Sequence, residues 1–171
     1  METILEYFNE LQWRMMLFDT LRLLAAFVLV LPIGFERERS RALGLRTFPL
    51  VAIGSCAYFL VATHVIGQDS GTSHPDAHTR LFQGLMAGIG FVGGGAILKT
   101  EQMVRGTATA ASIWATGAIG AAVAYDRYGV AIVISFTTFL TLQFLTPFSA
   151  EVEEQQSQKT GDSSDSMTNE K

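Results

Sequence analysis

Charged residues gather in one short stretch of an otherwise apolar sequence, between residues 36 and 46. Glu36 and Arg37 directly follow an apolar run, and further arginines follow them at Arg39, Arg41 and Arg46. Two interpretations fit this pattern. In the first, the arginines hold a loop on one side of a membrane and the nearby acids pair with them. In the second, Glu36 and Arg37 face the interior of a helix bundle, where charged groups are costly and are kept mainly for function or buried pairing.

A second arginine pattern occurs twice along the chain. Arg46 stands directly before Thr47, and Arg105 stands two residues before Thr107, so each arginine precedes a threonine that opens an apolar segment. A threonine side chain can cap a helix by accepting a hydrogen bond from a backbone N–H of the first turn. The neighbouring arginine can bind a carboxylate or a lipid phosphate. These four residues, together with Thr109, are therefore candidate functional residues.

Glycine crowds the apolar segment that precedes the second arginine. Pairs such as Gly84 and Gly88 lie four positions apart, and small residues at this spacing let helices approach closely in a bilayer. The predicted packing residues are Gly84, Gly88, Gly90, Gly93, Gly94, Gly95, Gly117 and Gly120. The alternative is a broken or flexible helix whose free carbonyls meet an ion or a solute. Gln83, one turn inside this segment, is predicted to form a hydrogen bond with another helix.

Several functional classes find no support in the sequence. No Ser-His-Asp or Cys-His arrangement is legible, so we expect no enzymatic activity. The single cysteine, Cys56, lies in an apolar run and permits neither a disulfide framework nor a cysteine-based zinc site. The residues His64, Asp69, His74, Asp76 and His78 lie in or near a polar segment, where a divalent metal site is one alternative. Their spacing matches no zinc motif, which favours a solvated loop. We therefore expect no metal site, no cofactor and, because no basic patch is present, no nucleic-acid partner.

Composition and hydropathy favour a membrane protein. Of 171 residues, 49% are hydrophobic and 16% are charged, against roughly 25% charged in soluble domains. We predict an all-α, polytopic fold with about five transmembrane helices, over residues 21–36, 47–67, 81–98, 107–125 and 128–148. The first charge-free run is short for a bilayer, which needs roughly 20 residues, and Pro32 and Gly34 are positioned to kink or break it. Two arrangements would lengthen this span: either Asp19 and Arg22 pair at one membrane interface, or Glu36 and Arg37 enter the membrane at the other end of the span.

The segments that flank these helices have their own character. Residues 1–20 are amphipathic and are expected to lie at the membrane interface. Residues 151–171 carry six acids and two lysines, a net charge of minus four that equals the formal charge of the whole chain, and we predict a disordered acidic tail. With five spans, the loops over residues 36–46 and 99–106 lie on the same side of the membrane. Both carry basic residues, which favour the cytoplasmic side. The N-terminus is therefore predicted outside and the C-terminus in the cytoplasm.

Several stretches resemble the MgtC/SapB family of bacterial inner-membrane proteins: residues 34–37, 44–47, 80–84, 88–98 and 104–120. The resemblance implies a small multi-pass protein of the inner membrane with five or so helices. It also implies a link to magnesium limitation, acid stress and, in pathogens, survival inside macrophages. The family prototype is viewed as a modulator of other membrane proteins, notably the F-type ATP synthase, more than as a magnesium transporter.

The sequence departs from the family prototype in three places. A folded cytoplasmic domain follows the prototype's helices, whereas here only the acidic tail follows, so the chain is similar to a short form. An asparagine and a cysteine of the prototype correspond to Ala108 and to Ala115 or Thr116. Two hypotheses result: a modulator linked to magnesium or proton/ATP homeostasis, or a transporter or channel for Mg²⁺ or a small solute. Mg²⁺ requires oxygen ligands, which Glu36 would supply. In both cases we expect a homo-oligomer in the lipid bilayer.

Overall fold

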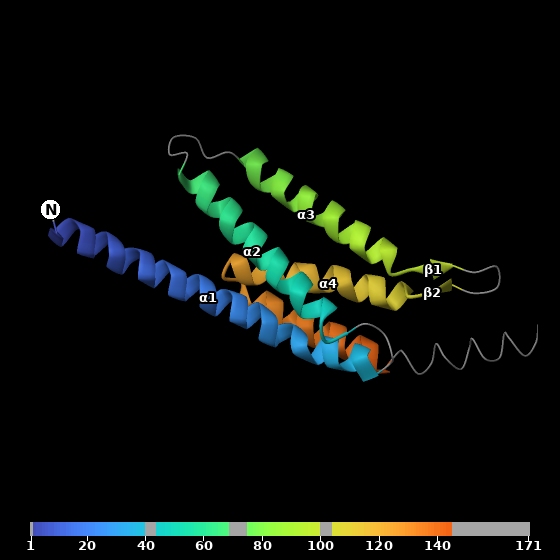
Figure 1. Ribbon diagram of the computed structural model, residues 1–171. Coiled ribbons are helices and arrows are strands. Elements are labelled where there is room, and N and C mark those ends of the chain that lie inside the picture. Colours follow the sequence, from blue (N-terminus) through green and yellow to red (C-terminus); the bar gives the residue numbers. More distant parts are fainter. Residues whose placement is uncertain (1, 40–43, 69–74, 100–103, 145–171) are drawn as a thin grey trace, which may run out of the picture.

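The computed structural model describes residues 2–39, 44–68, 75–99 and 104–144 (Figure 1). These residues form four labelled helices, which are α1 (Glu2–Arg39), α2 (Thr47–Gln68), α3 (Pro75–Gly95) and α4 (Thr107–Ala124). An apolar helix over Tyr128–Phe144 follows, and we call it the C-terminal helix. Between α3 and α4, the two-residue strands β1 (Leu98–Lys99) and β2 (Val104–Arg105) pair antiparallel. The predicted all-α fold is confirmed, with this short ladder in place of a plain loop.

Within the described ranges, three helical segments are long and apolar enough to cross a membrane. They are Trp13–Glu38, Thr47–Val65 and Thr107–Ala124. Large apolar side chains also remain exposed, including Phe91 at 85% and Leu50 at 67%, which suits lipid better than water. The chain is therefore an all-helical membrane protein. Neither α3 nor the shorter C-terminal helix is among these three segments, so five crossings stay a prediction.

The first helix differs from its prediction. α1 is one continuous α-helix that includes Pro32, where the sequence suggested an interfacial segment over 1–20 and a separate, kinked or broken span over 21–36. No glycine or proline occurs before Pro32, so nothing ends the helix near residue 20. At Pro32, neighbouring groups in a membrane helix can satisfy the backbone carbonyl that the ring leaves without a donor.

The glycine-rich helix is also displaced from its predicted bounds of 81–98. α3 begins at Pro75, a residue whose fixed φ suits the first position of a helix. It ends at Gly95, the third of three consecutive glycines, each of which lowers helix propensity by about 1 kcal/mol relative to alanine. The residues that follow leave the helix and enter β1 at Leu98.

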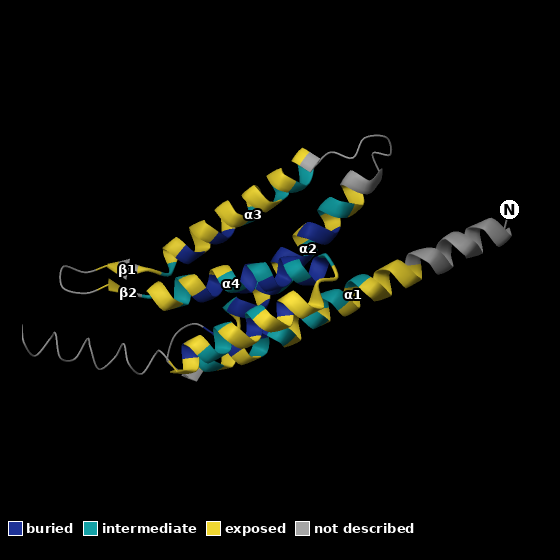
Figure 2. Ribbon diagram, turned by 180° about the vertical axis from the view of Figure 1, so that it is seen from behind, coloured by how far each residue is buried: buried dark blue, intermediate teal, exposed yellow. Residues whose placement is uncertain are grey.

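The core lies between α2 and α4, with α1 packed against both (Figure 2). A Cβ added to Gly120 would overlap the carbonyl oxygen of Ala52 and lie 2.9 Å from the Cβ of Ser55, so α4 approaches the backbone of α2 closely. α3 contacts α4 far more than α2, and most of its surface stays exposed in Figure 2. This leaves α3 as an outlying helix that is held mainly by α4.

Candidate functional site

Charged and titratable side chains from three parts of the chain meet at one end of the bundle. The Arg22 guanidinium of α1 binds both carboxylate oxygens of Asp126, with Nε–Oδ1 at 2.9 Å and Nη2–Oδ2 at 2.6 Å. It also lies 3.3 Å from Asp19 Oδ1, which forms the pair that one interpretation of the first helix predicted. His64 Nε2 of α2 lies 3.4 Å from the other Asp19 oxygen. The cluster therefore ties α1 to α2 and to the turn after α4.

Asp126 is held in place by the way α4 ends. Its φ is +57°, a left-handed conformation that aspartate tolerates better than most non-glycine residues. The Asp126 N–H donates to the carbonyl of Val123, and the Arg127 N–H donates to the carbonyl of Ala122. These two bonds form a Schellman motif, the usual way of satisfying the last carbonyls of a helix. This role of Asp126 was not predicted from the sequence, although an acid at a hairpin turn and Arg22 at a span end were the available signals.

A second cluster forms where α1 ends. Arg37 is buried at 6% exposure, and its Nε and Nη2 have no hydrogen-bond partner within the described residues. Glu36 beside it is half-buried. Glu38 Oε2 accepts hydrogen bonds from the backbone N–H groups of Gly44 at 3.2 Å and Leu45 at 3.3 Å. The structure thus places Arg37 inside the bundle and folds the chain around residues 44–45 back onto α1.

Close backbone contact holds this second cluster together. A Cβ added to Gly44 would overlap the carbonyl oxygen of Gly34 and approach the carbonyl carbon of Arg37 to 3.0 Å. Only glycine at position 44 permits this approach without a shift of the backbone. Two of the family-like stretches, residues 34–37 and 44–47, are therefore neighbours in space.

Thr47 and Thr107 are the first residues of their helices and do not occupy the predicted N-cap positions. The N-cap of α4 is Gly106, with φ at +90° and no side-chain capping bond, and Thr107 is the first helical residue. The prediction that Thr107 caps α4 is wrong, because the chain leaves β2 through a left-handed turn that only glycine adopts at low cost. Thr47 likewise lies inside α2 as its first residue.

The remaining candidates are scattered. Arg46 and Thr107 are exposed, Thr47 and Thr109 are half-buried, and the side chain of Arg105 lies outside the described part of the chain. Gln83 is exposed, and no hydrogen bond in the described ranges joins it to another helix, contrary to its prediction. No described group of three or more His, Cys, Asp or Glu side chains is arranged to hold a metal ion.

The predicted packing glycines divide into three groups. Gly117 and Gly120 lie against α2 or α3 side chains and backbone, and Gly93 faces Ala110 of α4. Added Cβ atoms on Gly84 would meet only the Tyr58 hydroxyl, at 3.3 Å. Added Cβ atoms would meet nothing within 4 Å at four positions, which are Gly88, Gly90, Gly94 and Gly95. These four do not pack against another helix within the described chain.

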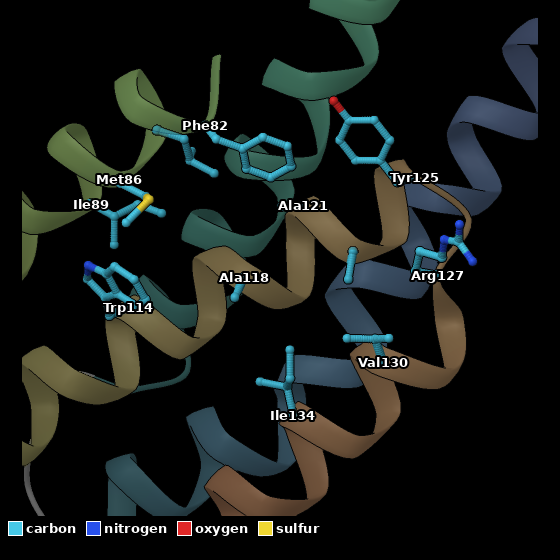
Figure 3. Close-up of a pocket in the computed structure, with 12 residues that line it drawn as sticks. Phe82, Met86, Ile89, Trp114, Ala118, Ala121, Tyr125, Arg127, Val130 and Ile134 are labelled. Carbon is cyan, nitrogen blue, oxygen red and sulfur yellow. The ribbon is translucent and has the colours of Figure 1, made fainter. Parts of the chain in front are cut away.

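An apolar groove lies between α3, α4 and the C-terminal helix (Figure 3). Its volume is about 500 Å³, within the usual range for ligand sites of ~300–1,000 Å³. The walls include Phe82, Met86, Ile89, Trp114, Val130 and Ile134. At one end, the Tyr125 ring stacks on Phe82 with centroids 5.6 Å apart, and its hydroxyl lies 2.9 Å from His78 Nδ1. This groove was not predicted from the sequence, because its walls are ordinary apolar residues from three separate segments.

Comparison with known proteins gives a consistent set of relatives. Protein SrpB of Synechococcus elongatus is 40% identical over 130 residues, which cover 71% of each chain. Protein MgtC of Salmonella typhimurium is 41% identical over 109 residues, 63% of this chain and 44% of its own. The Escherichia coli protein named "Putative magnesium transporter YhiD" is 34% identical over 125 residues, 72% of this chain and 58% of its own. The chain thus spans about half the length of the last two.

No solved structure matches the chain. A model of the MgtC family matches residues 23–151, from the apolar part of α1 to beyond the C-terminal helix. This range includes residues 34–37 and 44–47, which are neighbours in space at the end of α1, and it includes the glycine-rich α3. Because the match covers most of its length, the chain belongs to the MgtC family.

Proposed function

We propose that this protein is a multi-pass protein of the bacterial inner membrane that modulates another membrane protein in magnesium or proton/ATP homeostasis. Family membership and the names of its relatives support the link to magnesium. The F-type ATP synthase is the first partner to test. In this proposal the N-terminus lies outside and the arginine-bearing residues 36–46 face the cytoplasm, as the distribution of basic residues favours.

One observation favours a modulator over an ion path. The carboxylate of Asp126 is bound through both oxygens by Arg22, and that of Asp19 lies against Arg22 and His64. These acids are paired within the bundle, and no described set of three acid, histidine or cysteine side chains converges on a point. A cation such as Mg²⁺, which requires several oxygen ligands, therefore finds no ready-made site in the described helices.

Co-purification from native membranes tests the proposal. Tagged protein is extracted in mild detergent, and subunits of the F-type ATP synthase are quantified by mass spectrometry. The exposed Arg46 lies among residues 36–46, which we propose face the cytoplasm and contact the partner, so Arg46→Gln should lower the recovery of these subunits. Arg14→Gln, at an exposed position near the other end of α1, removes the same charge and should leave it unchanged. Recovery of no membrane partner by the well-folded protein would contradict a modulator role.

Magnesium transport is the second candidate function. It is favoured by Glu36, a half-buried carboxylate beside the buried Arg37 at the end of α1. The test is Mg²⁺ flux into liposomes that contain the purified protein. If Glu36 lines the path, Glu36→Gln abolishes flux, whereas Glu38→Gln, at an exposed position, preserves it. Absence of flux from the folded, reconstituted protein would exclude this function.

We also propose that the protein is a homo-oligomer. Gly88 and Gly95 lie seven positions apart, hence on one face of α3, and neither meets another helix among the residues that the structure describes. A second copy would give this face the close helix contact that small residues permit in lipid. In a Cys56→Ala background, Gly88→Cys should form disulfide-linked dimers in membranes when an oxidant such as copper phenanthroline is added. Leu50→Cys, on an exposed position of α2, serves as the matched control.

A further inference from the structure

The groove between α3, α4 and the C-terminal helix combines a long apolar wall with a single cation at one end (Figure 3). Of the lining residues in the described part of the chain, Arg127 alone is charged. We propose that this groove holds one acyl chain of an anionic phospholipid, with the lipid phosphate bound by Arg127. The proposal concerns a binding site and is independent of the modulator and transporter functions.

The depth of the groove matches one leaflet of a bilayer. Along α4 the lining residues run from Trp114 to Tyr125, with Arg127 just beyond. At about 1.5 Å per residue this is roughly 16 Å, about half of the roughly 30 Å hydrocarbon core. An acyl chain of one leaflet extends over that depth. A transmembrane helix of a second copy would need a complementary surface across the whole core.

The position of Arg127 suits a headgroup. It follows the turn at Asp126 that ends α4, and Tyr125 and Tyr128 flank it. Tyrosine is enriched at the level of the lipid headgroups, so this end of the groove belongs at the membrane–water interface. The aliphatic and aromatic walls then extend from Arg127 toward the centre of the bilayer, as an acyl chain does below its phosphate.

The charge of Arg127 is available for an anion. Its neighbour Asp126 binds Arg22 through both oxygens, and no ion pair joins Arg127 to an acid among the residues that the structure describes. Arginine binds phosphate through two parallel hydrogen bonds. The acids of residues 151–171 match this charge, but Val152 and Met167 are the only apolar residues of that segment, too few for the apolar wall of the groove.

Tryptophan quenching tests the proposal directly. The chain has two tryptophans, so Trp13→Phe leaves Trp114 as the only reporter, inside the groove. The full-length variant is reconstituted in phosphatidylcholine vesicles with a fixed fraction of bromine-labelled phosphatidylglycerol or bromine-labelled phosphatidylcholine. Bromine quenches the indole on contact. We expect phosphatidylglycerol to be preferred about fivefold at the Trp114 site, as one arginine near the surface provides.

Charge variants at position 127 identify the headgroup contact. Arg127→Gln should reduce the preference for phosphatidylglycerol to near one, and Arg127→Lys should keep most of it. Arg14→Gln, an exposed position on α1 outside the groove, should leave the preference unchanged. An equal preference in wild type and Arg127→Gln would overturn the proposal. Protection of Trp114 from both labelled lipids would also overturn it, since protein would then cover the groove.

Discussion

Arg22 and Asp126 are 104 residues apart in the sequence, and they form a bidentate ion pair with Nη2–Oδ2 at 2.6 Å and Nε–Oδ1 at 2.9 Å. The pair joins α1 to the turn between α4 and the C-terminal helix. Further along the same two helices, the Ser135 hydroxyl donates to the carbonyl of Leu29. The C-terminal helix therefore runs parallel to α1 and is fixed to it at its start and again two turns later.

Removal of this ion pair should cost a modest amount of stability. Asp126→Asn keeps the side-chain shape and the tolerance for a left-handed backbone while it removes the charge. Because the Asp126 side chain is about half exposed, we expect a loss of about 1 kcal/mol in the free energy of unfolding. The double variant Arg22→Gln/Asp126→Asn should lose no more than the larger single loss. Thermal unfolding in detergent measures both, and simple additivity of the two losses would contradict direct pairing.

The backbone at Asp126 provides a separate test. Its φ of +57° is allowed for glycine at low cost but is strained for a β-branched residue. Asp126→Gly and Asp126→Val both remove the carboxylate, so their difference isolates the conformational term. We expect the valine variant to be less stable by about 1–2 kcal/mol. Equal unfolding temperatures for the two variants would show that the turn does not keep this conformation.

Because of its contacts, replacement of Gly120 should destabilise the fold far more than replacement of an exposed glycine. An added methyl group would overlap the backbone of α2 at Ala52, where no side-chain rotation can relieve it. We expect Gly120→Ala to lower the free energy of unfolding by about 1–3 kcal/mol. Gly54→Ala is the matched control, since a Cβ there meets nothing within 4 Å and alanine favours the helix. Destabilisation of both variants by the same amount would argue against close α2–α4 contact.

The sequence predicts the helical character of the chain well because apolar runs and their punctuation are local properties. α2 and α4 begin at Thr47 and Thr107, the residues with which the predicted segments begin. The bounds of α1 were harder to predict from the sequence, because this helix continues through Pro32, a residue that normally indicates a break. Local patterns predict where helices form, whereas neighbouring helices decide whether such a residue is tolerated.

The site was less predictable than the fold, for the same reason. Gly88 and Gly120 are both small residues in small-residue repeats, yet one faces open space and the other faces the backbone of Ala52. Spacing alone cannot distinguish them, because the partner helix determines which face is covered. The Arg22–Asp126 pair and the apolar groove likewise join segments far apart in the sequence. Such contacts follow from the arrangement of the helices and leave no local pattern.

Gly44 tests whether the end of α1 and residues 44–45 form one unit. Gly44→Ala would place a methyl group against the Gly34 carbonyl and the backbone N of Glu38. The chain must then move away, and the two hydrogen bonds to Glu38 Oε2 should be lost. We expect faster amide exchange at Gly44 and Leu45 than in wild type, with exchange in α2 unchanged. Glu38→Gln should have a weaker effect, and wild-type exchange in Gly44→Ala would contradict the close approach.

Replacement of Arg37 tests whether its buried guanidinium is needed for the stability of the fold. Buried donors without partners are destabilising, and replacement of a buried charge by an apolar side chain of similar length is often neutral or stabilising. We therefore expect Arg37→Met to keep or raise the unfolding temperature of the isolated protein. Arg22→Met, which leaves two acids without their arginine, should instead lower the unfolding temperature. A strongly destabilised Arg37→Met protein would show that the guanidinium is satisfied within the fold.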